Sequence, residues 1–437
     1  MKSRLGVGII GFGTVGTGVA KILLENAALI RRRVGVPVEL VRIADIDLTR
    51  DRGIALPAGL LTNDAKQVLN DPAIEVVIEL IGGYDTAKRV ILEAIAAGKH
   101  VVTANKALLA LHGEEIFEAA ARRGVDLGFE ASVGGGIPVI RALTEGLAGD
   151  RIQSIYGIIN GTSNYILSRM THEGQSFEVV LKAAQEAGYA EADPTFDVAG
   201  IDSAHKLAIL ASLAFGTPVN FKEIFTEGIT HITPADIAYA KELGFTIKLL
   251  GIAKLVNGEV EARVHPTMLS SASPIAQVDG VYNAIQVVGD AVGDVVLYGR
   301  GAGSLPTGSA VVSDVIAIGR NLLKGAVGRV PAASFQQDQR RPLRMTPMED
   351  IRSLYYLRFT VVDRPGVLAQ IAGELGRCGI SISSMLQQGR REGQTVSVVI
   401  KTHMAQERDV QVALREINRK PFVSEPALLI RVEGKDE

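Results

Sequence analysis

The sequence predicts an α/β protein with three folded parts: a nucleotide-binding domain on a parallel sheet, an α+β domain, and a small C-terminal α+β module. A glycine-rich turn joins a strand to a helix near the N-terminus, which is typical of the first part. Strands and long helices without a second such fingerprint follow, and the residues after 350 read as β-α-β-β-α-β. The 437 residues allow two to four domains, each with its own core.

The composition indicates a protein of the cell interior. With a formal net charge of −2 and 22% charged residues, we expect no nucleic-acid partner held by bulk charge. The N-terminus enters directly into a strand pattern without the features of a signal peptide, and no apolar run reaches the ~18–20 residues that cross a bilayer. The single cysteine, Cys378, precludes an intrachain disulfide and a multi-cysteine metal site. We therefore predict a cytoplasmic protein with no membrane partner.

The glycine-rich turn lies between the predicted strand Leu5–Ile10 and the predicted helix Thr17–Leu24. In the spacing G-x-G-x-x-G, the first glycine permits a tight turn, the second lets the backbone approach a pyrophosphate, and the third lets the helix pack closely. This context predicts a Rossmann-type dinucleotide-binding domain. The predicted cofactor-binding residues of the turn are Gly11, Phe12, Gly13, Thr14, Val15 and Gly16.

The end of the second strand bears on the choice of cofactor. Val38–Ala44 is predicted as that strand, and Asp45 follows it. An acid at this point binds the ribose hydroxyls of adenosine and favours NAD, whereas Arg42, Arg50 and Arg52 are near enough in sequence to receive the 2′-phosphate of NADP. We expect NAD, or both NAD and NADP, as the cofactor.

Lys106 follows a later strand of the same sheet. The strands Val76–Leu80 and His100–Thr103 are separated by the helix Thr86–Ala97, and ligands bind at the carboxyl ends of such strands. Lys106 opens the next helix, where the helix dipole disfavours a cation, so a compensating group is expected nearby. An ordinary surface lysine is the alternative.

Two loops are rich in glycine. Glu130–Pro138 follows the strand Val125–Phe129 and could offer backbone oxygens and one carboxylate, which are the ligands that hard cations prefer. A flexible connector to the next domain is the alternative. The second loop, Arg300–Thr307, leads into the predicted helix Gly308–Leu323, whose N-terminus suits an anion.

The stretch Gly188–Lys206 places four acids around one lysine; the acids are Glu191, Asp193, Asp197 and Asp202. Asp202 and Lys206 lie four residues apart at the start of the predicted helix Ile201–Phe215, so they share one face. A capped helix with a surface ion pair is the common explanation of such a pair. The density of acids and glycines is what sets this stretch apart.

This stretch carries a resemblance to a known family. The pattern Ala184-x-x-x-Gly188-Tyr189-Ala190, then Asp193-Pro194-x-x-Asp197-Val198-x-Gly200-x-Asp202-x-x-x-Lys206, resembles the signature of homoserine dehydrogenases. The segments Thr103-Ala104-Asn105-Lys106-Ala107 and Asn160-Gly161-Thr162-Ser163-Asn164 also resemble that family. The resemblance implies NAD(P)-dependent interconversion of L-homoserine and L-aspartate 4-semialdehyde in threonine, methionine and isoleucine biosynthesis.

The resemblance also suggests roles for individual residues. Lys106 would lie beside nicotinamide and substrate, and we expect Lys206 to exchange the hydroxyl proton. A lysine can do so if burial or a second cation lowers its pKa, although Asp202 would oppose that shift. The expected substrate-binding residues are Glu191, Asp197, Asp202, Lys206 and Gly161, with Thr103, Lys106 and Gly303 added to the cofactor site. The implied sodium ligands are Glu130 and the backbone oxygens of Val133, Gly135 and Ile137.

The C-terminal part begins with the alternating strand Tyr355–Val362 and the turn Asp363-Arg364-Pro365-Gly366-Val367-Leu368. Its ferredoxin-like element order and this turn resemble the ACT domain, a module that binds amino acids and regulates biosynthetic enzymes. Threonine is the candidate ligand, and an appendage without a ligand is the alternative. The predicted domains are 1–140 with 304–325 for the cofactor, 141–303 for catalysis and dimerisation, a linker at 326–350, and the ACT domain at 351–437.

Two rival functions use the same modules. An aldehyde dehydrogenase that acts through a thioester needs a cysteine nucleophile, but Cys378 lies in the C-terminal module. A non-catalytic sensor of nucleotide and amino acid would show no turnover, and the complete set of two lysines and four acids argues against it. We expect a homo-oligomer, either a dimer or a tetramer.

Overall fold

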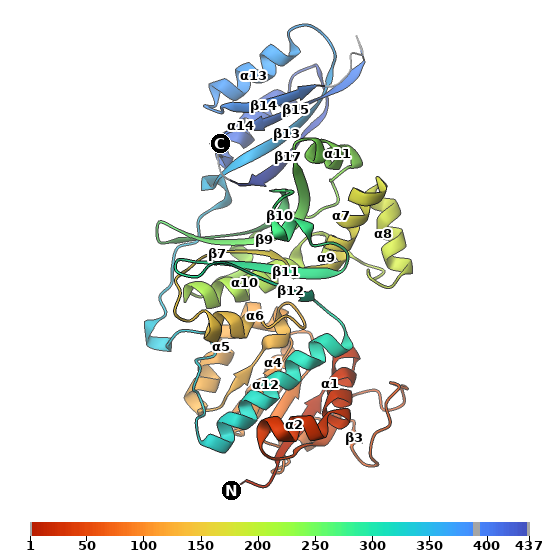
Figure 1. Ribbon diagram of the computed structural model, residues 1–437, viewed down its shortest axis with the longest axis vertical. Coiled ribbons are helices and arrows are strands. Elements are labelled where there is room, and N and C mark those ends of the chain that lie inside the picture. The colour runs from red at the N-terminus through yellow and green to blue at the C-terminus, as the bar shows by residue number, and fades with distance from the viewer. Residues whose placement is uncertain (1, 388–393, 435–437) are drawn as a thin grey trace.

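The computed structural model describes residues 2–387 and 394–434. The chain runs along one long axis, with the N-terminal domain at one end and the C-terminal module at the other (Figure 1). Among the described residues, no helix combines the length and the apolar character needed to cross a bilayer. The predicted domain boundaries stay predictions, but the elements within them are now defined.

Six parallel strands form the first sheet, in the order β3-β2-β1-β4-β5-β6. They are β1 (Leu5–Ile10), β2 (Val38–Ala44), β3 (Leu61–Thr62), β4 (Val76–Glu79), β5 (His100–Thr103) and β6 (Leu127–Gly128). β1, β4 and β5 are buried along their whole length, which explains their largely apolar sequences; Glu79, His100 and Thr103 are the buried polar residues at their ends. This strand order is that of a doubly wound dinucleotide-binding sheet, so the predicted Rossmann-type domain is confirmed.

Helices cover both faces of this sheet, and one of them comes from much later in the chain. They are α1 (Thr14–Glu25), α2 (Ala27–Val34), α3 (Lys66–Leu69), α4 (Asp85–Ala96), α5 (Lys106–Arg123) and α12 (Ser304–Lys324). α12 lies along α1 (Figure 1). The approach is close, since a Cβ at Gly18 of α1 would collide with Ser304. α12 begins earlier than predicted because Pro306 is tolerated in a first helical turn.

The middle domain and the C-terminal module share one sheet, which the sequence did not predict. Its main path is β12-β11-β7-β9-β10-β17-β13-β15-β14. The middle domain supplies β7 (Ile152–Ile158), β9 (Phe245–Val256), β10 (Glu259–Ser270), β11 (Tyr282–Gly289) and β12 (Gly293–Arg300), and the short β8 (Phe225–Thr226) pairs with β10. The two parts join where Thr267–Leu269 of β10 pairs in parallel with Arg431–Glu433 of β17.

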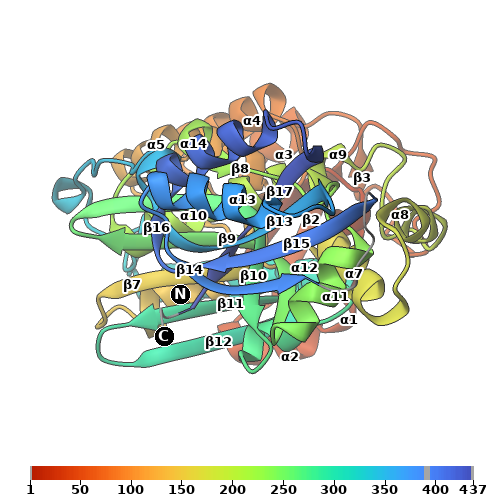
Figure 2. The same ribbon diagram turned by 90° about the horizontal axis from the view of Figure 1, so that it is seen from above.

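β12 was missed by the sequence analysis because it is an edge strand whose residues are all exposed or half-buried, and glycines lie at its start and near its end. Figure 2 shows its hairpin with β11 at the border of the molecule. The middle domain also contains α6 (Val139–Arg141), α7 (Gly161–Glu173), α8 (Phe177–Glu186), α9 (Thr195–Val198), α10 (Ile201–Phe215) and α11 (Pro234–Glu242). α10 has the predicted bounds and lies between the middle sheet and α5, so most of its residues are buried.

The C-terminal module follows the predicted β-α-β-β-α-β order, with one additional short strand. Its elements are β13 (Arg352–Val362), α13 (Val367–Arg377), β14 (Ile382–Gln387), β15 (Thr395–Thr402), β16 (Ala405–Gln406), α14 (Glu407–Asn418) and β17 (Val423–Glu433). The strand order β17-β13-β15-β14 is antiparallel throughout. The ferredoxin-like fold is therefore confirmed.

Candidate active site

The glycine-rich turn after β1 has the geometry that a bound dinucleotide needs. Gly11 adopts φ +101°, and a Cβ there would lie 2.5 Å from the carbonyl carbon of Leu80. A Cβ at Gly13 would meet no atom within 4 Å, so the backbone at this position is open to a ligand. A Cβ at Gly16 would collide with the carbonyl of Gly11, which explains the close packing of α1. The three positions thus differ as the spacing predicts.

The carboxylate of Asp45 is already engaged by its own chain. Its Oδ2 accepts from the Phe12 amide at 2.5 Å, and its Oδ1 accepts from Arg52 Nη2 at 3.2 Å. The guanidinium of Arg52 lies 4.9 Å from the centre of the Phe12 ring. Arg42, by contrast, donates to Gln67. Arg52 is therefore the arginine that the fold brings to the expected adenosine position.

Lys106 and Lys206 converge on one carboxylate. Lys106 Nζ lies 2.7 Å from Oδ1 of Asp202, and Lys206 Nζ lies 2.7 Å from its Oδ2. Lys206 also donates to the carbonyl of Ile159 at 2.6 Å. Asp202 is thus the group that compensates the cation at the start of α5, and it comes from another domain. Asp202 and Lys206 are both buried, so a surface ion pair does not describe them, and Lys106 differs from an ordinary surface lysine because it pairs with the buried Asp202.

Burial and charge together set the protonation of this cluster. Burial alone would raise the pKa of Asp202, but the positive charges of Lys206 and Lys106 outweigh it and hold that pKa well below its usual range. Burial lowers the pKa of Lys206; Asp202 opposes this shift and the charge of Lys106 adds to it. A lysine with a lowered pKa can accept a proton nearer neutral pH than a free lysine.

Asn160 joins the two acids of the site and was not among the predicted site residues. Its Nδ2 donates to Asp197 Oδ1 at 2.7 Å and to Asp202 Oδ2 at 2.9 Å. Its Oδ1 accepts from the Ser163 amide at 2.8 Å and so caps α7. Gly161 follows it at the helix start. The polar turn after β7 was the signal that could have identified Asn160.

Glu191 does not join this cluster. It lies in the exposed loop before α9, and its carbonyl accepts from Gln185 Nε2 at 3.0 Å. Phe196 lies nearer, since Lys106 Nζ is 6.0 Å from the centre of its ring. The same ring stacks on His205 at a centroid distance of 5.5 Å. Phe196 lies in the sequence between Glu191 and Asp197, the two predicted substrate-binding acids, and nothing in the sequence indicated that its ring would lie beside Lys106 and His205.

Thr103 lies at the end of β5 and is fixed by an acid that the sequence analysis overlooked. Its Oγ1 donates to Glu79 Oε2 at 2.7 Å, and Glu79 Oε1 accepts from the Ile81 amide at 2.7 Å. Burial raises the pKa of Glu79, against the hydrogen bonds that lower it. Glu79 therefore anchors the loops after β4 and β5. An acid that ends an apolar strand was the available signal.

The glycine loop after β6 places Glu130 in a buried setting. Its two carboxylate oxygens accept from the amides of Ile140 at 2.8 Å and Arg141 at 2.9 Å, and its own amide donates to Asp314 at 2.9 Å. Burial and the charge of Asp314 raise the pKa of Glu130 to about 7. Burial raises the pKa of Asp314 to about 6. Two buried acids beside the single guanidinium of Arg141 favour an additional cation nearby.

Of the three carbonyl oxygens predicted to bind sodium, two have no backbone hydrogen-bond donor among the described residues. Within the described ranges, the carbonyls of Val133 and Gly135 accept no backbone hydrogen bond, whereas that of Ile137 accepts from Val139 at 2.8 Å. No three His, Cys, Asp or Glu side chains of the described residues form a metal-ligand group. A Cβ at Gly135 would lie 2.5 Å from Gly301, so this loop packs against the second glycine-rich turn, which holds Gly303 before α12.

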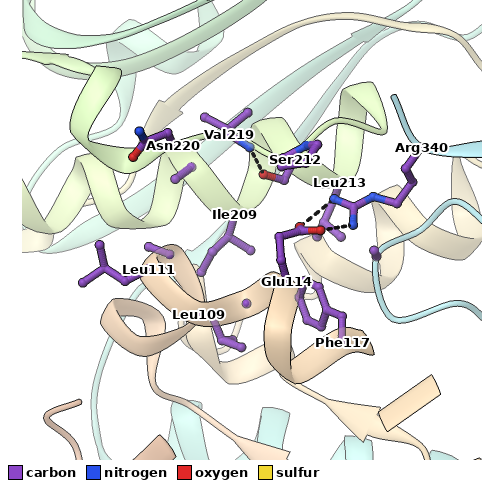
Figure 3. A pocket seen from close by; sticks show the side chains of 15 residues that line it. Leu109, Leu111, Glu114, Phe117, Ile209, Ser212, Leu213, Val219, Asn220 and Arg340 are labelled. Atoms are coloured by element: carbon purple, nitrogen blue, oxygen red, sulfur yellow. Dashed lines mark hydrogen bonds and ion pairs between the residues drawn. The ribbon is translucent and has the colours of Figure 1, made fainter. Parts of the chain in front are cut away.

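Two of the cavities formed by the described residues bear on the predicted domains, and both lie away from the lysine pair. One, of about 240 Å³, lies between α5 and α10 and is lined mainly by apolar side chains such as Leu109, Phe117 and Ile209 (Figure 3). At its border, Arg340 of the linker donates to both oxygens of Glu114 at 2.5 and 2.7 Å. The other, of about 330 Å³, is formed by residues 361–368 together with Gln387, Val396 and Val398 of the C-terminal module.

Three family profiles match the chain. The homoserine dehydrogenase profile matches residues 138–316, and the profile of the homoserine dehydrogenase NAD binding domain matches residues 11–130. The ACT domain profile matches residues 355–422. In chain order, the matched segments cover the dinucleotide-binding domain, then the middle domain with part of α12, and then most of the C-terminal module.

Relatives and solved structures match over nearly the whole chain. Homoserine dehydrogenases from Pseudomonas aeruginosa and Neisseria gonorrhoeae are 48% and 46% identical to it, each over 98% of both chains. The crystal structure of a homoserine dehydrogenase from Thiobacillus denitrificans is 48% identical and superposes with a TM-score of 0.93 over 98% of both chains. A hyperthermophilic archaeal homoserine dehydrogenase in complex with NADPH is 26% identical, with a TM-score of 0.62 over 74% of this chain and 98% of that one. The two lysines meet one buried aspartate beside the carboxyl ends of the strands of a dinucleotide-binding sheet. Together with the similarity over nearly the whole chain, this shows that the chain belongs to the homoserine dehydrogenase family.

Proposed function

We propose that Lys106, Lys206 and Asp202 form the catalytic centre for the NAD(P)-dependent interconversion of L-homoserine and L-aspartate 4-semialdehyde, the reaction of this family. The observation that carries the proposal is the convergence of both lysines on Asp202, each at 2.7 Å. The centre lies beside the carboxyl end of β5, where a doubly wound sheet binds its ligands.

The two lysines have different roles in the proposed reaction. Oxidation of the alcohol moves a hydride from carbon to the nicotinamide ring and releases the hydroxyl proton. Lys206 takes this proton as a neutral amine and returns it in the reverse direction, which fits its lowered pKa. Lys106 is more accessible, with 35% of its side chain exposed against 10% for Lys206, and it positions the substrate oxygen. Asp202 holds both amines in place.

The substrate binds between α7, α9 and α10. Asp197 and Asp202 share the amide of Asn160, so their carboxylates are held toward one another. Gly161 starts α7 beside them. Glu191 is proposed to bind the substrate ammonium from its exposed loop, which requires the loop to approach when substrate is present.

The cofactor is proposed to be NADP or NAD, bound by Gly11 to Gly16, Thr103, Lys106 and Gly303. The archaeal relative is a complex with NADPH. Arg52 supports use of NADP because it supplies a cation beside Asp45, while Asp45 itself supports NAD. The enzyme is therefore proposed to use both.

Sodium is the proposed bound cation. Glu130 is buried beside Asp314, and the carbonyls of Val133 and Gly135 have no backbone donor within the described ranges, which suits a hard cation. Glu130, Val133, Gly135 and Ile137 would hold it. Its role would be to neutralise the two acids and fix the loop against the turn before α12.

Regulation and assembly are proposed for the remaining parts. The cavity formed by residues 361–368 supports an amino acid such as threonine at the C-terminal module. A homo-oligomer, dimer or tetramer, is supported by the free edge of β12, on which Val296 and Tyr298 are exposed. A cytoplasmic location stays a prediction.

One assay tests the central proposal. Oxidation of NADPH and NADH should be followed in parallel with L-aspartate 4-semialdehyde, with and without threonine. We expect turnover with both cofactors and slower turnover with threonine present. The absence of turnover with either cofactor would refute the proposed reaction.

A further inference from the structure

The C-terminal module reaches the middle domain through two charged residues of β17. Arg431 and Glu433 lie two residues apart on this strand, and both side chains cross to the middle domain. Glu433 accepts from Lys254 of β9 and Arg263 of β10, each at 2.7 Å. Arg431 instead reaches Glu227, which follows β8. The ion pairs of these two neighbouring residues therefore reach different segments of the middle domain: those of Glu433 reach β9 and β10, and that of Arg431 reaches the residue after β8.

Arg431 holds Glu227 from inside the C-terminal module. Its Nη1 donates to Glu227 Oε2 at 2.7 Å, while its Nε and Nη2 donate to Glu407 at 3.0 and 2.6 Å. Its guanidinium also lies 5.0 Å from the centre of the Phe225 ring. Only 3% of the Arg431 side chain is exposed, so loss of Glu227 would remove a partner from a buried charge.

The residues after Glu227 contact the end of α9, the helix that carries Asp197. The amide of Ile229 donates to the carbonyl of Val198 at 2.9 Å. A Cβ at Gly228 would collide with the same carbonyl, so the two backbones are in direct contact. No flexible side chain lies between them, and a shift of one segment must therefore move the other.

Val198 lies between the two acids of the active site. Val198 directly follows Asp197 and ends α9. Two residues later, Gly200 precedes α10, and Asp202 lies in the first turn of that helix. A Cβ at Gly200 would lie 3.2 Å from a methyl group of Thr226, so β8 also packs tightly against this turn. The segment from 225 to 229 is thus the direct neighbour of the turn that joins α9, with Asp197, to α10, with Asp202.

We infer that Glu227 is a positioning residue that links the C-terminal module to α9 and the turn before α10 through its ion pair with Arg431. With the pair intact, the contact of residues 228 and 229 with Val198 holds Asp197 and Asp202 at the lysine pair. A ligand that shifts β17 would change substrate affinity by this path. The inference deepens the proposed function and rests on the proposed substrate roles of the two acids.

Glu227→Gln tests this link because it keeps the shape of the side chain and removes its charge. We expect the KM for L-aspartate 4-semialdehyde to rise about 5-fold or more, since couplings between sites usually amount to about 5- to 150-fold, while kcat stays near that of the wild type. Hydrogen exchange at the Ile229 amide and in residues 195–202 should become faster.

Glu433→Gln is the matched control, since it also removes an ion pair of β17 that crosses the same boundary. Its partners lie on β9 and β10, so we expect lower thermal stability but an unchanged KM and unchanged exchange in residues 195–202. An unchanged KM in Glu227→Gln, or equal effects of both variants on KM, would overturn the inference. If the wild type showed no turnover, this would instead count against the proposed function. The comparison of hydrogen exchange in residues 195–202 between the two variants would still decide whether Glu227 fixes that segment.

Discussion

The ammonium groups of Lys106 and Lys206 form ion pairs with opposite oxygens of the same Asp202 carboxylate, each at 2.7 Å. They come from α5 of the cofactor domain and α10 of the middle domain, which pack against each other. Two ammonium groups on one carboxylate leave an excess of positive charge. Such an excess stabilises a developing alkoxide and eases loss of a proton from the buried lysine. The site therefore exists only when the two domains are packed together.

Replacement of Lys206 should slow turnover strongly without unfolding the protein. We expect Lys206→Met to lower kcat by about 10²- to 10⁴-fold, the usual contribution of general acid–base catalysis, because methionine fills the space but carries no proton. Asp202 keeps Lys106 as a partner, so the fold should persist. Lys99→Met is the control, since Lys99 is also buried but donates to backbone carbonyls of Asp71 and Ile74. Normal kcat in Lys206→Met at full folding would contradict the proposed role.

The pH dependence of the two directions should be opposite. Homoserine oxidation needs the neutral amine of Lys206, so its kcat should rise with pH, and the lowered pKa places this rise below the ~10.4 of a free lysine. Semialdehyde reduction needs the ammonium, so its kcat should fall over the same range. Asp202→Asn removes the charge that stabilises the ammonium and should move both profiles to lower pH. Profiles that stay in place or move upward in this variant would exclude Lys206 as the titrating group.

The helices of the site could be predicted from the sequence, but the packing of α5 against α10 could not. Gly200 and Gly216 flank α10 in the left-handed conformation, with φ +83° and +64°, and so its bounds are readable from the sequence. The pairing of Lys106 with Asp202 depends on how two domains pack, which no local pattern encodes. Asn160 was overlooked because an asparagine before a helix is already explained by its role as the helix cap, which gives no reason to place it in the active site.

The shared sheet was unpredictable for a related reason. Periodicity indicates which face of a strand is buried, but not which strand lies beside it. β10 and β17 pair over Thr267–Leu269 and Arg431–Glu433 although they belong to different parts of the chain. The arginine at 431 within an apolar run of residues was the available hint, because a charged side chain in a buried strand needs a partner.

Arg52 should contribute to the use of NADP. It lies beside Asp45, so its loss would leave an uncompensated carboxylate near a 2′-phosphate. We expect Arg52→Gln to raise the KM for NADPH about 10-fold, in line with the loss of one charge-assisted hydrogen bond, and to raise that for NADH less. Arg42→Gln is the control, because Arg42 bonds Gln67 instead. An equal rise for both cofactors in Arg52→Gln would indicate a purely structural role.

Binding of sodium should be visible as a change in stability. The wild type should unfold at a higher temperature in sodium chloride than in tetramethylammonium chloride of equal ionic strength, since a ligand at 100 times its Kd adds about 2.7 kcal/mol to the free energy of unfolding. Glu130→Gln should be less stable in both salts, because its amide cannot accept from both backbone donors, and it should lose the difference between them. Glu145→Gln, which removes a nearby carboxylate that pairs with Arg141 and Arg329, should keep the difference. Equal unfolding temperatures of the wild type in the two salts would refute the sodium site, because only a cation small enough for the loop carbonyls can bind there.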